Sequence, residues 1–234
     1  MENILKPKFM KKIVLGLSGG MDSTTLLGYY VEQGFEVHCC NFQYGSKQNS
    51  FEEKSVEAII AHYTKNGAKV FLHSIHLEET FKDFTSNLLN SGGEIPEGHY
   101  EAEVMRLTVV PGRNMIFGSI MAGLAESLRA SLVALGVHSG DHYIYADCRE
   151  EFIKAFSYAA HLSSDSAITI QAPFINDDKT SILARGFSYK IPVPYHLTRT
   201  CYTNHEKSCG KCGSCFERLE AFNNLNKIDP ISYE

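Results

Sequence analysis

The stretch of sequence that decides the fold is Lys12-Ile13-Val14-Leu15-Gly16-Leu17-Ser18-Gly19-Gly20-Met21-Asp22-Ser23. Residues 12–17 form a short apolar run that ends at glycines, which is typical of a buried strand. A helix is predicted directly after the glycines, from Asp22 to Glu32. A turn between a strand and a helix directs backbone N–H groups and the positive end of the helix dipole at an anion. The stretch therefore predicts a strand, a phosphate-binding turn and a helix.

Strands and helices alternate along the rest of the chain. Further strands are predicted at residues 36–42, from residue 70 onward, at 131–137 and at 168–172, and helices around residues 56–63 and at 114–128, 150–161 and 179–185. Gly186 is expected to end the helix at 179–185, since glycine is common just after a helix. This alternation predicts an α/β fold of the Rossmann-like type, in which helices cover both faces of a parallel sheet.

The segment Pro192-Val193-Pro194 is the predicted boundary between two units. Residues 1–11 are expected to be a flexible tail, and residues 12–194 the α/β domain. Residues 195–234 are expected to form a small C-terminal module that carries four cysteines and a last helix at 216–225. No internal repeat or low-complexity linker interrupts this order.

The glycine turn has the residue types that a pyrophosphate site needs. Gly19 and Gly20 allow close approach of the backbone to an anion, and Ser18 and Ser23 can donate hydroxyl hydrogen bonds. Asp22 is a carboxylate beside a phosphate site, so a role with Mg²⁺ is expected. The whole segment from Leu17 to Ser23 is thus a candidate for binding ATP.

Three other interpretations of the turn compete with this one. Gly16-Leu17-Ser18-Gly19-Gly20 also fits the nucleophile elbow G-x-S-x-G, but that elbow follows several strands and only one strand precedes it here. The Walker pattern fails because no Gly-Lys-Ser/Thr is present. A glycine turn without a ligand stays open on the turn alone.

The second motif is a group of four cysteines, Cys201, Cys209, Cys212 and Cys215. Overlapping Cys-x-x-Cys turns present thiolates from one tight loop, which suits the tetrahedral geometry of zinc. Four thiolates leave no open position, so the metal is predicted to be structural. An iron–sulfur cluster is the main alternative, because four thiolates suit both.

Composition excludes several classes of protein. The net charge is -5, with 22 Lys plus Arg against 27 Asp plus Glu, so the basic footprint of a nucleic-acid-binding protein is absent. No run of about eighteen apolar residues predicts a membrane helix, and the N-terminal residues are not expected to form a secretory signal. Seven cysteines, four of them clustered, fit a reducing cytoplasm.

Charged residues in the middle of the chain follow predicted strands or begin predicted helices. Arg113 opens a helix, where a positive charge is unfavourable unless it has a role. The carboxyl edge of a parallel sheet is where ligands bind. The segment beyond the strand 131–137 therefore supplies further candidates for substrate contact, namely His138, Asp141, His142, Asp147 and Arg149.

The hexapeptide Ser18-Gly19-Gly20-Met21-Asp22-Ser23 resembles the pyrophosphate loop of N-type ATP pyrophosphatases, which have the adenine nucleotide alpha hydrolase-like fold. From residue 12 to about 222 the chain resembles one family of them, the 7-cyano-7-deazaguanine synthases. The matching segments, in order, are that hexapeptide, Tyr44-Gly45, Val110-Pro111-Gly112-Arg113-Asn114, Gly136-Val137-His138-Ser139-Gly140-Asp141-His142, Asp147-Cys148-Arg149, Pro173-Phe174 with Lys179, and Cys201-Tyr202 with the three later cysteines.

The resemblance implies the reaction and its components. ATP would adenylate the carboxylate of 7-carboxy-7-deazaguanine, ammonia would displace AMP to give an amide, and a second ATP would activate the amide for conversion to the nitrile. It implies ATP, Mg²⁺ and structural Zn²⁺ as ligands, and a homodimer. Lys179 would lie near a phosphate, Arg113 near anionic groups, and Asp141, His142 and Asp147 near the substrate or the ammonia step.

The chain departs from the family pattern after Tyr44-Gly45, where Ser46-Lys47-Gln48 replaces Gln-Arg-His. Lysine lacks the forked guanidinium of arginine, and glutamine cannot carry protons as histidine can. One alternative is therefore an enzyme that stops at the amide or joins the deazaguanine to a protein amine. An RNA-modifying ATP pyrophosphatase and a non-catalytic nucleotide sensor are two further alternatives.

Overall fold

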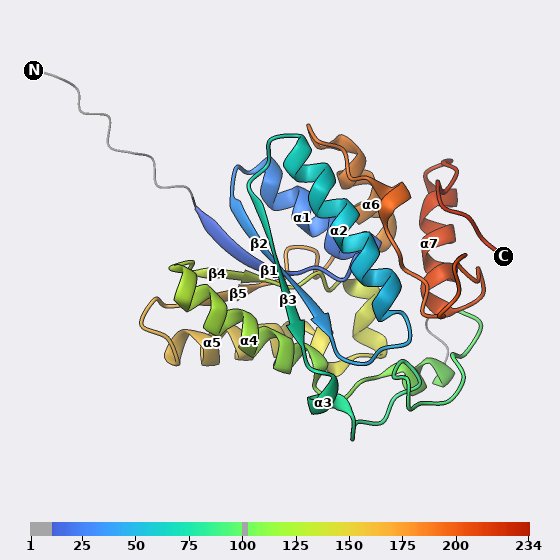
Figure 1. Cartoon of the computed structure of the whole chain (residues 1–234), viewed down its shortest axis with the longest axis horizontal. Helices are drawn as coiled ribbons and strands as arrows, with labels where there is room; N and C mark the ends of the chain where they lie inside the picture. Colours follow the sequence, from blue (N-terminus) through green and yellow to red (C-terminus); the bar gives the residue numbers. More distant parts are fainter. Residues whose placement is uncertain (1–10, 100–102) are drawn as a thin grey trace, which may run out of the picture.

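The computed structural model describes residues 11–99 and 103–234, and a five-stranded parallel sheet lies at its centre (Figure 1). The strands are β1 (Lys12–Gly16), β2 (Glu36–Gln43), β3 (Val70–His76), β4 (Leu132–Ala134) and β5 (Thr169–Gln171), in the order β3-β2-β1-β4-β5. In register, Val14 of β1 lies opposite His38 of β2 on one side and Val133 of β4 on the other. The predicted parallel sheet is confirmed.

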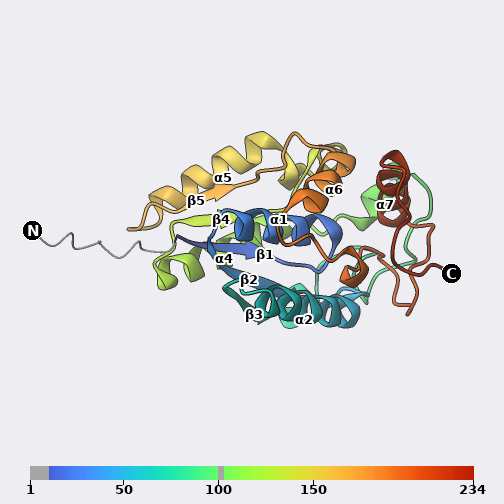
Figure 2. The same cartoon turned by 90° about the horizontal axis from the view of Figure 1, so that it is seen from above.

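Helices cover both faces of this sheet, as predicted. Figure 1 and Figure 2 show α1 (Met21–Glu32), α2 (Asn49–Lys65) and α6 (Lys179–Ser188) on one face, and α4 (Arg113–Leu128) and α5 (Glu150–Leu162) on the other. The remaining helices are α3 (Glu78–Phe81), α7 (Gly213–Asn224) and four short 3-10 turns, η1 (Glu103–Thr108), η2 (Ser139–Tyr143), η3 (Ala146–Cys148) and η4 (Tyr195–Leu197). None of the helices in the described ranges is long and apolar enough to span a bilayer.

The apolar run of β1 explains why two layers of helices form. Val14 packs into the core beneath α4 and α5, whereas Ile13 and Leu15 pack into the core beneath α1, α2 and α6. All three side chains are fully buried. Because successive side chains of a strand point to opposite faces, a continuous apolar run needs a cover on each face.

Cys39 and Cys40 repeat this pattern on β2. Cys39 lies in one core and Cys40 in the other, and burial raises the pKa of both thiols. They are packing residues.

The strand order creates a crevice at the carboxyl edge of the sheet. The chain builds β2 and β3 on one side of β1 and then β4 and β5 on the other. At this reversal the connections leave in opposite directions, which opens a gap outside the ends of β1 and β4. β4 ends at Ala134, three residues before its predicted end, and residues 135–137 line the cavity in that gap.

The C-terminal residues attach to the edge of the α/β layers through shared packing. Phe222 of α7 lies in one apolar cluster with Leu183 of α6 and Met21 of α1. Inside this segment the fully buried Arg218 donates two hydrogen bonds to Asp229, at 2.7 and 2.9 Å. The same guanidinium donates to Thr198 at 2.6 Å, so it links α7 to the chain that leads into it.

Two helix ends differ from the prediction. α7 begins at Gly213, three residues before the predicted start, and α6 continues through Gly186 to Ser188. Gly186 therefore does not end the helix. A glycine is needed there for close packing instead. A Cβ at this position would lie 2.0 Å from the hydroxyl oxygen of Tyr195 and 2.8 Å from Val193. Of the predicted flexible tail, residues 1–10 lie outside the described part of the chain.

We predict that Gly186→Ala destabilises the protein by about 1–3 kcal/mol, because the added methyl group overlaps the buried Tyr195 side chain. Gly123→Ala in α4 is the matched control, since nothing lies within 4 Å of a Cβ there. That change should be neutral or stabilise the helix by up to about 1 kcal/mol. Urea unfolding measures both, and equal stability of the two variants would contradict this account of Gly186.

Candidate nucleotide and metal sites

A cavity lies at the carboxyl edge of the sheet, in the crevice between β1 and β4. It is lined by Gly16, Leu17, Ser18, Gly20, Asp22, Ser23, Cys40, Asn41, Phe42, Tyr44, Gln48, Glu52, Arg113, Asn114, Phe117, Met121, Leu135, Gly136, Val137, Asp141, Tyr145, Cys148, Arg199, Thr200, Tyr202 and Ser214. Side chains from β2 and α4 form an apolar part, and charged groups from the glycine turn, α2 and α4 form a polar part. Tyr202 and Ser214 belong to the C-terminal segment, so that segment completes the wall.

The glycine turn has the geometry of an anion site. Gly19 has φ +79°, and a Cβ there would lie 3.1 Å from the carbonyl oxygen of Glu52, so this position needs glycine. Gly20, which precedes α1, has no side chain that could cap the helix, so the first N–H groups of α1 can point at a ligand. The hydroxyls of Ser18 and Ser23 lie 3.0 Å apart at the mouth of the turn.

Leu17 and Met21 have structural contacts within the turn, although Leu17 also lines the cavity. The N–H of Leu17 donates to the carbonyl of Cys40 at 2.8 Å, and its own carbonyl accepts from Asn41 at 3.0 Å. Met21 is fully buried in the apolar cluster shared by α1, α6 and α7. Both residues therefore hold the turn in place by packing and strand pairing.

Asp22 is the carboxylate of the turn, and its two oxygens have different surroundings. Its Oδ2 lies 3.2 Å from Nζ of Lys179 and 3.8 Å from Nε2 of His138. Its Oδ1 is buried and has no hydrogen-bond partner within the described ranges. An oxygen in this state fits a cation ligand, because an unpaired buried acceptor is costly.

Lys179, at the start of α6, is buried between two carboxylates. Its Nζ lies 2.7 Å from Oε2 of Glu217, which comes from α7, as well as close to Asp22. Burial disfavours the charged lysine, but the two carboxylates outweigh it and raise the pKa of Lys179 above its ordinary value. Sequence reasoning missed Glu217, since nothing local marks a helix residue that reaches across to another unit.

Arg113 is a cation of the cavity that comes from the start of α4. Gly112, with φ +63°, turns the chain into α4, and the Arg113 guanidinium donates to the hydroxyl of Tyr44 at 3.2 Å. Asp147 Oδ2 accepts the backbone N–H of Asn114 at 2.9 Å and so holds the start of the helix. The arginine is therefore placed toward the cavity by a capped helix end rather than by a carboxylate partner.

The structure brings together some of the predicted substrate residues and separates others. Asp22, Arg113 and Asp141 line the cavity. Asp141 Oδ2 accepts the N–H of His138 at 3.2 Å and closes the η2 turn. His142 and Asp147 are not among the cavity-lining residues; His142 follows Asp141 in the η2 turn, and Asp147 contacts the start of α4.

Cys148 lines the cavity but is not an activated nucleophile. Burial, Asp141 and Asp147 raise the pKa of its thiol, and Asn114 donates to the sulfur at 3.2 Å. A thiol with a raised pKa stays protonated at neutral pH, where the thiolate would be the reactive form.

Lys47 and Gln48, the residues that depart from the family pattern, face different surroundings. Lys47 Nζ donates to the carbonyls of Asn87, Gly92 and Gly93, at 2.7, 3.1 and 2.6 Å. Lys47 therefore stabilises the loop that follows α3 through these hydrogen bonds, and it does not line the cavity. Gln48 does line the cavity, and its buried Oε1 has no hydrogen-bond partner in the described residues.

Glu52, in the first turn of α2, is a cavity residue that sequence reasoning missed. Burial raises its pKa to about 7, although Arg113, Gln48 and Arg199 act in the opposite direction. A carboxyl group that changes protonation near neutral pH in a ligand cavity is a candidate for proton transfer. The available signal was its place nine residues after the end of β2, in the first turn of the next helix.

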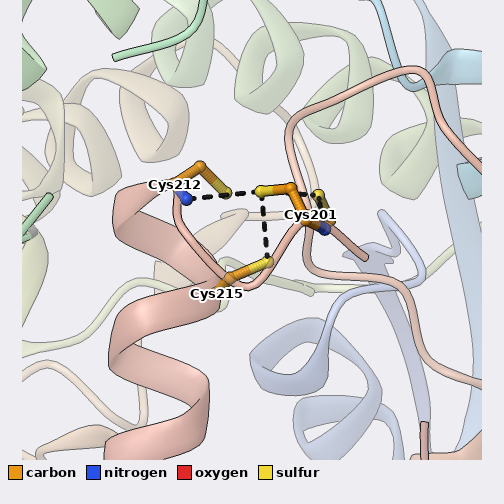
Figure 3. A group of neighbouring side chains, drawn as sticks. Cys201, Cys212 and Cys215 are labelled. Carbon is orange, nitrogen blue, oxygen red and sulfur yellow. Dashed lines mark hydrogen bonds between the residues drawn. The ribbon is translucent and has the colours of Figure 1, made fainter. Parts of the chain in front are cut away.

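The four cysteines of the predicted metal site meet at the start of α7. Their sulfur atoms all lie within 4.8 Å of one another, and all four residues are buried. Figure 3 shows Cys212 and Cys215 at the helix start facing Cys201 on the preceding segment. Backbone N–H groups of Lys211 and Cys212 donate to the sulfur of Cys209, at 3.4 and 3.3 Å. This donor set fits a metal held by four thiolates.

Together, the fold and these two sites define an ATP-binding α/β protein of the pyrophosphate-loop type with a four-cysteine metal site. The family model described as queuosine biosynthesis protein QueC matches residues 12–226, and the chain belongs to this family. The family resemblance seen in the sequence is thus confirmed.

Curated relatives match almost the whole chain. The 7-cyano-7-deazaguanine synthase 2 of Colwellia psychrerythraea is 44% identical over 225 residues, which are 96% of this chain and 99% of that protein. The 7-cyano-7-deazaguanine synthase of Pseudoalteromonas atlantica is 41% identical over 225 residues, 96% of this chain and 100% of that protein. Among solved structures, the NMN synthetase of Francisella tularensis has the same fold, with a TM-score of 0.53, 13% identity, and coverage of 94% of this chain and 79% of that one.

We predict that Glu52→Gln changes stability in a pH-dependent way. The folded state binds the Glu52 proton more tightly than the unfolded chain, so this group favours folding below its ordinary pKa of 4.5 and loses that effect as the pH rises to about 7. Glutamine stays neutral at every pH. Relative to the wild type, the variant should gain on the order of 1–3 kcal/mol at about pH 8 and little near pH 4.5.

Thermal or urea unfolding at the two pH values measures this difference. Glu53→Gln, at the exposed neighbouring position, is the control and should differ little from the wild type at either pH. A difference for Glu52→Gln that does not grow with pH would contradict the burial of a carboxyl group at this site.

Proposed function

We propose that the protein is an ATP-dependent ligase that converts 7-carboxy-7-deazaguanine and ammonia into 7-cyano-7-deazaguanine, a precursor of queuosine. The observation that carries this proposal is that the phosphate-binding turn and Arg113 line the same cavity. A site for a nucleotide pyrophosphate and a fixed cation for a second anion are then within reach of each other. The names of the relatives and the family match support the same reaction.

The chemistry requires such a shared cavity. A carboxylate is a poor electrophile, and transfer of AMP to its oxygen gives it a good leaving group. Ser18, Gly19, Gly20 and Ser23 would bind the pyrophosphate through backbone N–H groups and hydroxyls. Asp22, through its unpaired Oδ1, would hold Mg²⁺, which neutralises phosphate charge when bound.

Two cationic side chains would then bind the phosphate and the substrate carboxylate separately. Lys179, already charged beside the turn, would contact a phosphate oxygen, and Arg113 would bind the substrate carboxylate in the forked geometry that suits it. Asp141 would meet the substrate or the incoming ammonia from the η2 turn. Asp147 and His142 would act by holding the ends of α4 and η2.

The C-terminal site would hold Zn²⁺ as a structural ion through Cys201, Cys209, Cys212 and Cys215. Four thiolates and no open position suit this role, and the buried sulfurs already receive backbone N–H donors. A homodimer that acts on small molecules, without a nucleic-acid partner, is the assembly expected from the family resemblance and the net charge of -5.

We predict about one zinc ion per chain in metal analysis of the purified protein, and no visible absorption of the iron–sulfur type. Cys212→Ser should lose the metal and unfold at a lower temperature, since a structural zinc ion contributes directly to folding. Lys211→Ala, at the exposed position next to it, should keep the metal. Bound iron with sulfide would contradict the zinc assignment.

We predict that incubation with 7-carboxy-7-deazaguanine, Mg-ATP and ammonium yields the nitrile together with AMP and pyrophosphate, as measured by mass spectrometry. Arg113→Ala should lower kcat/KM at least about a hundredfold, because it removes a preorganised cation from the cavity. Arg106→Ala is the control, since that side chain is 51% exposed and pairs with Glu103. Accumulation of the amide, or absence of AMP, would contradict the proposed reaction.

A further inference from the structure

Glu52 is a carboxyl group of the cavity to which the proposed reaction has so far given no role. It belongs to the first turn of α2, and its backbone lies against Gly19 of the phosphate-binding turn. Its side chain lines the same cavity as Asp22 and Arg113. It therefore lies near the point where the nucleotide and the substrate carboxylate would meet.

The charged and titratable groups around Glu52 come from three other parts of the fold. Arg113 reaches it from α4, Arg199 from the segment after η4, and Tyr44 from the end of β2. Both arginines have other partners. Arg113 donates to Tyr44, and the Arg199 guanidinium donates to three carbonyls in the segment 203–206 while stacking on Phe51 at 4.3 Å.

The other carboxylates of the cavity are committed elsewhere. Asp22 faces Lys179 with Oδ2 and would hold Mg²⁺ with Oδ1, and Asp141 accepts the N–H of His138. Gln48, one helical turn before Glu52, has an amide that cannot carry a proton. Glu52 is thus the carboxylate that a small cationic ligand entering this part of the cavity would meet.

We propose that Glu52 binds the ammonium ion and accepts its proton, so that neutral ammonia attacks the adenylated substrate. This inference depends on the proposed function. Ammonium is the main form of ammonia nitrogen at neutral pH, and it has no free electron pair with which to attack. A carboxylate with a pKa near 7 can both bind this cation and take up its proton under these conditions.

The step balances in protons and electron pairs. One proton passes from ammonium to the Glu52 carboxylate and leaves neutral ammonia. The nitrogen lone pair forms a bond to the acyl carbon, and the bond from that carbon to the AMP oxygen breaks with its electron pair on AMP. The nitrogen then loses one more proton to water, and Glu52 returns its own proton to water.

The test compares the wild type with Glu52→Gln and with Glu53→Gln, the exposed neighbour. Three rates are measured at neutral pH with 7-carboxy-7-deazaguanine. These are ATP–pyrophosphate exchange without a nitrogen donor, amide formation with ammonium, and hydroxamate formation with hydroxylamine, which is unprotonated at this pH.

Glu52→Gln should lower amide formation from ammonium by about a hundredfold or more. Exchange and hydroxamate formation should stay close to the wild-type rates, because neither needs a proton taken from the nucleophile. The deficit with ammonium should shrink as the pH rises and free ammonia increases. Glu53→Gln should match the wild type in all three rates.

Other results would overturn the proposal in distinguishable ways. Loss of exchange in Glu52→Gln would assign Glu52 to ATP binding, and an equal loss with ammonium and hydroxylamine would assign it to positioning the acyl adenylate. An unchanged ammonium rate would show that Glu52 takes no proton. Absence of exchange in the wild type would overturn the proposed function itself, and this inference with it.

Discussion

The buried ion pairs of Lys179 are the interaction on which the functional end of the molecule depends. Lys179 Nζ lies 3.2 Å from Asp22 in the phosphate-binding turn and 2.7 Å from Glu217 in α7, and the side chain is 5% exposed. A charge buried without partners is strongly destabilising, so all three groups must stay together. One lysine thereby fixes the turn, α6 and the C-terminal segment relative to one another. It also keeps a positive charge beside the place where phosphates would bind.

The C-terminal segment depends on the rest of the chain because it is too small to form a core of its own. Its apolar side chains are buried against α1 and α6, in the cluster that contains Met21 and Phe222. Its interior is otherwise polar, with Arg218 paired to Asp229 and four cysteine sulfurs in contact range. A metal held by those sulfurs would supply the stability that burial of apolar area cannot. Two residues of this segment, Tyr202 and Ser214, in turn form part of the cavity wall.

Burial and charge pairing act in opposite directions on the groups of the cavity. At Lys179 two carboxylates outweigh the cost of burial and keep the lysine charged. At Glu52 burial outweighs two nearby arginines and moves the pKa to about 7. The same low-dielectric environment thus keeps Lys179 charged and lets Glu52 change its protonation state near neutral pH. Pairs of groups with such different protonation behaviour are what proton transfer beside bound phosphates requires.

The sequence by itself determined those features that neighbouring residues specify. The apolar run 12–17 with its glycines predicted β1 and the turn, and the close spacing of Cys209, Cys212 and Cys215 predicted that their sulfurs meet, because both depend on local backbone geometry. The alternation of strands and helices likewise predicted the parallel sheet. Only the tertiary structure decided that Gly186 packs on Tyr195, that Lys47 fastens a distant loop, and that Glu52 and Glu217 belong to the functional end. These roles depend on which side chains arrive from distant elements, since burial, charge pairing and pKa are properties of spatial neighbours and not of the residue itself.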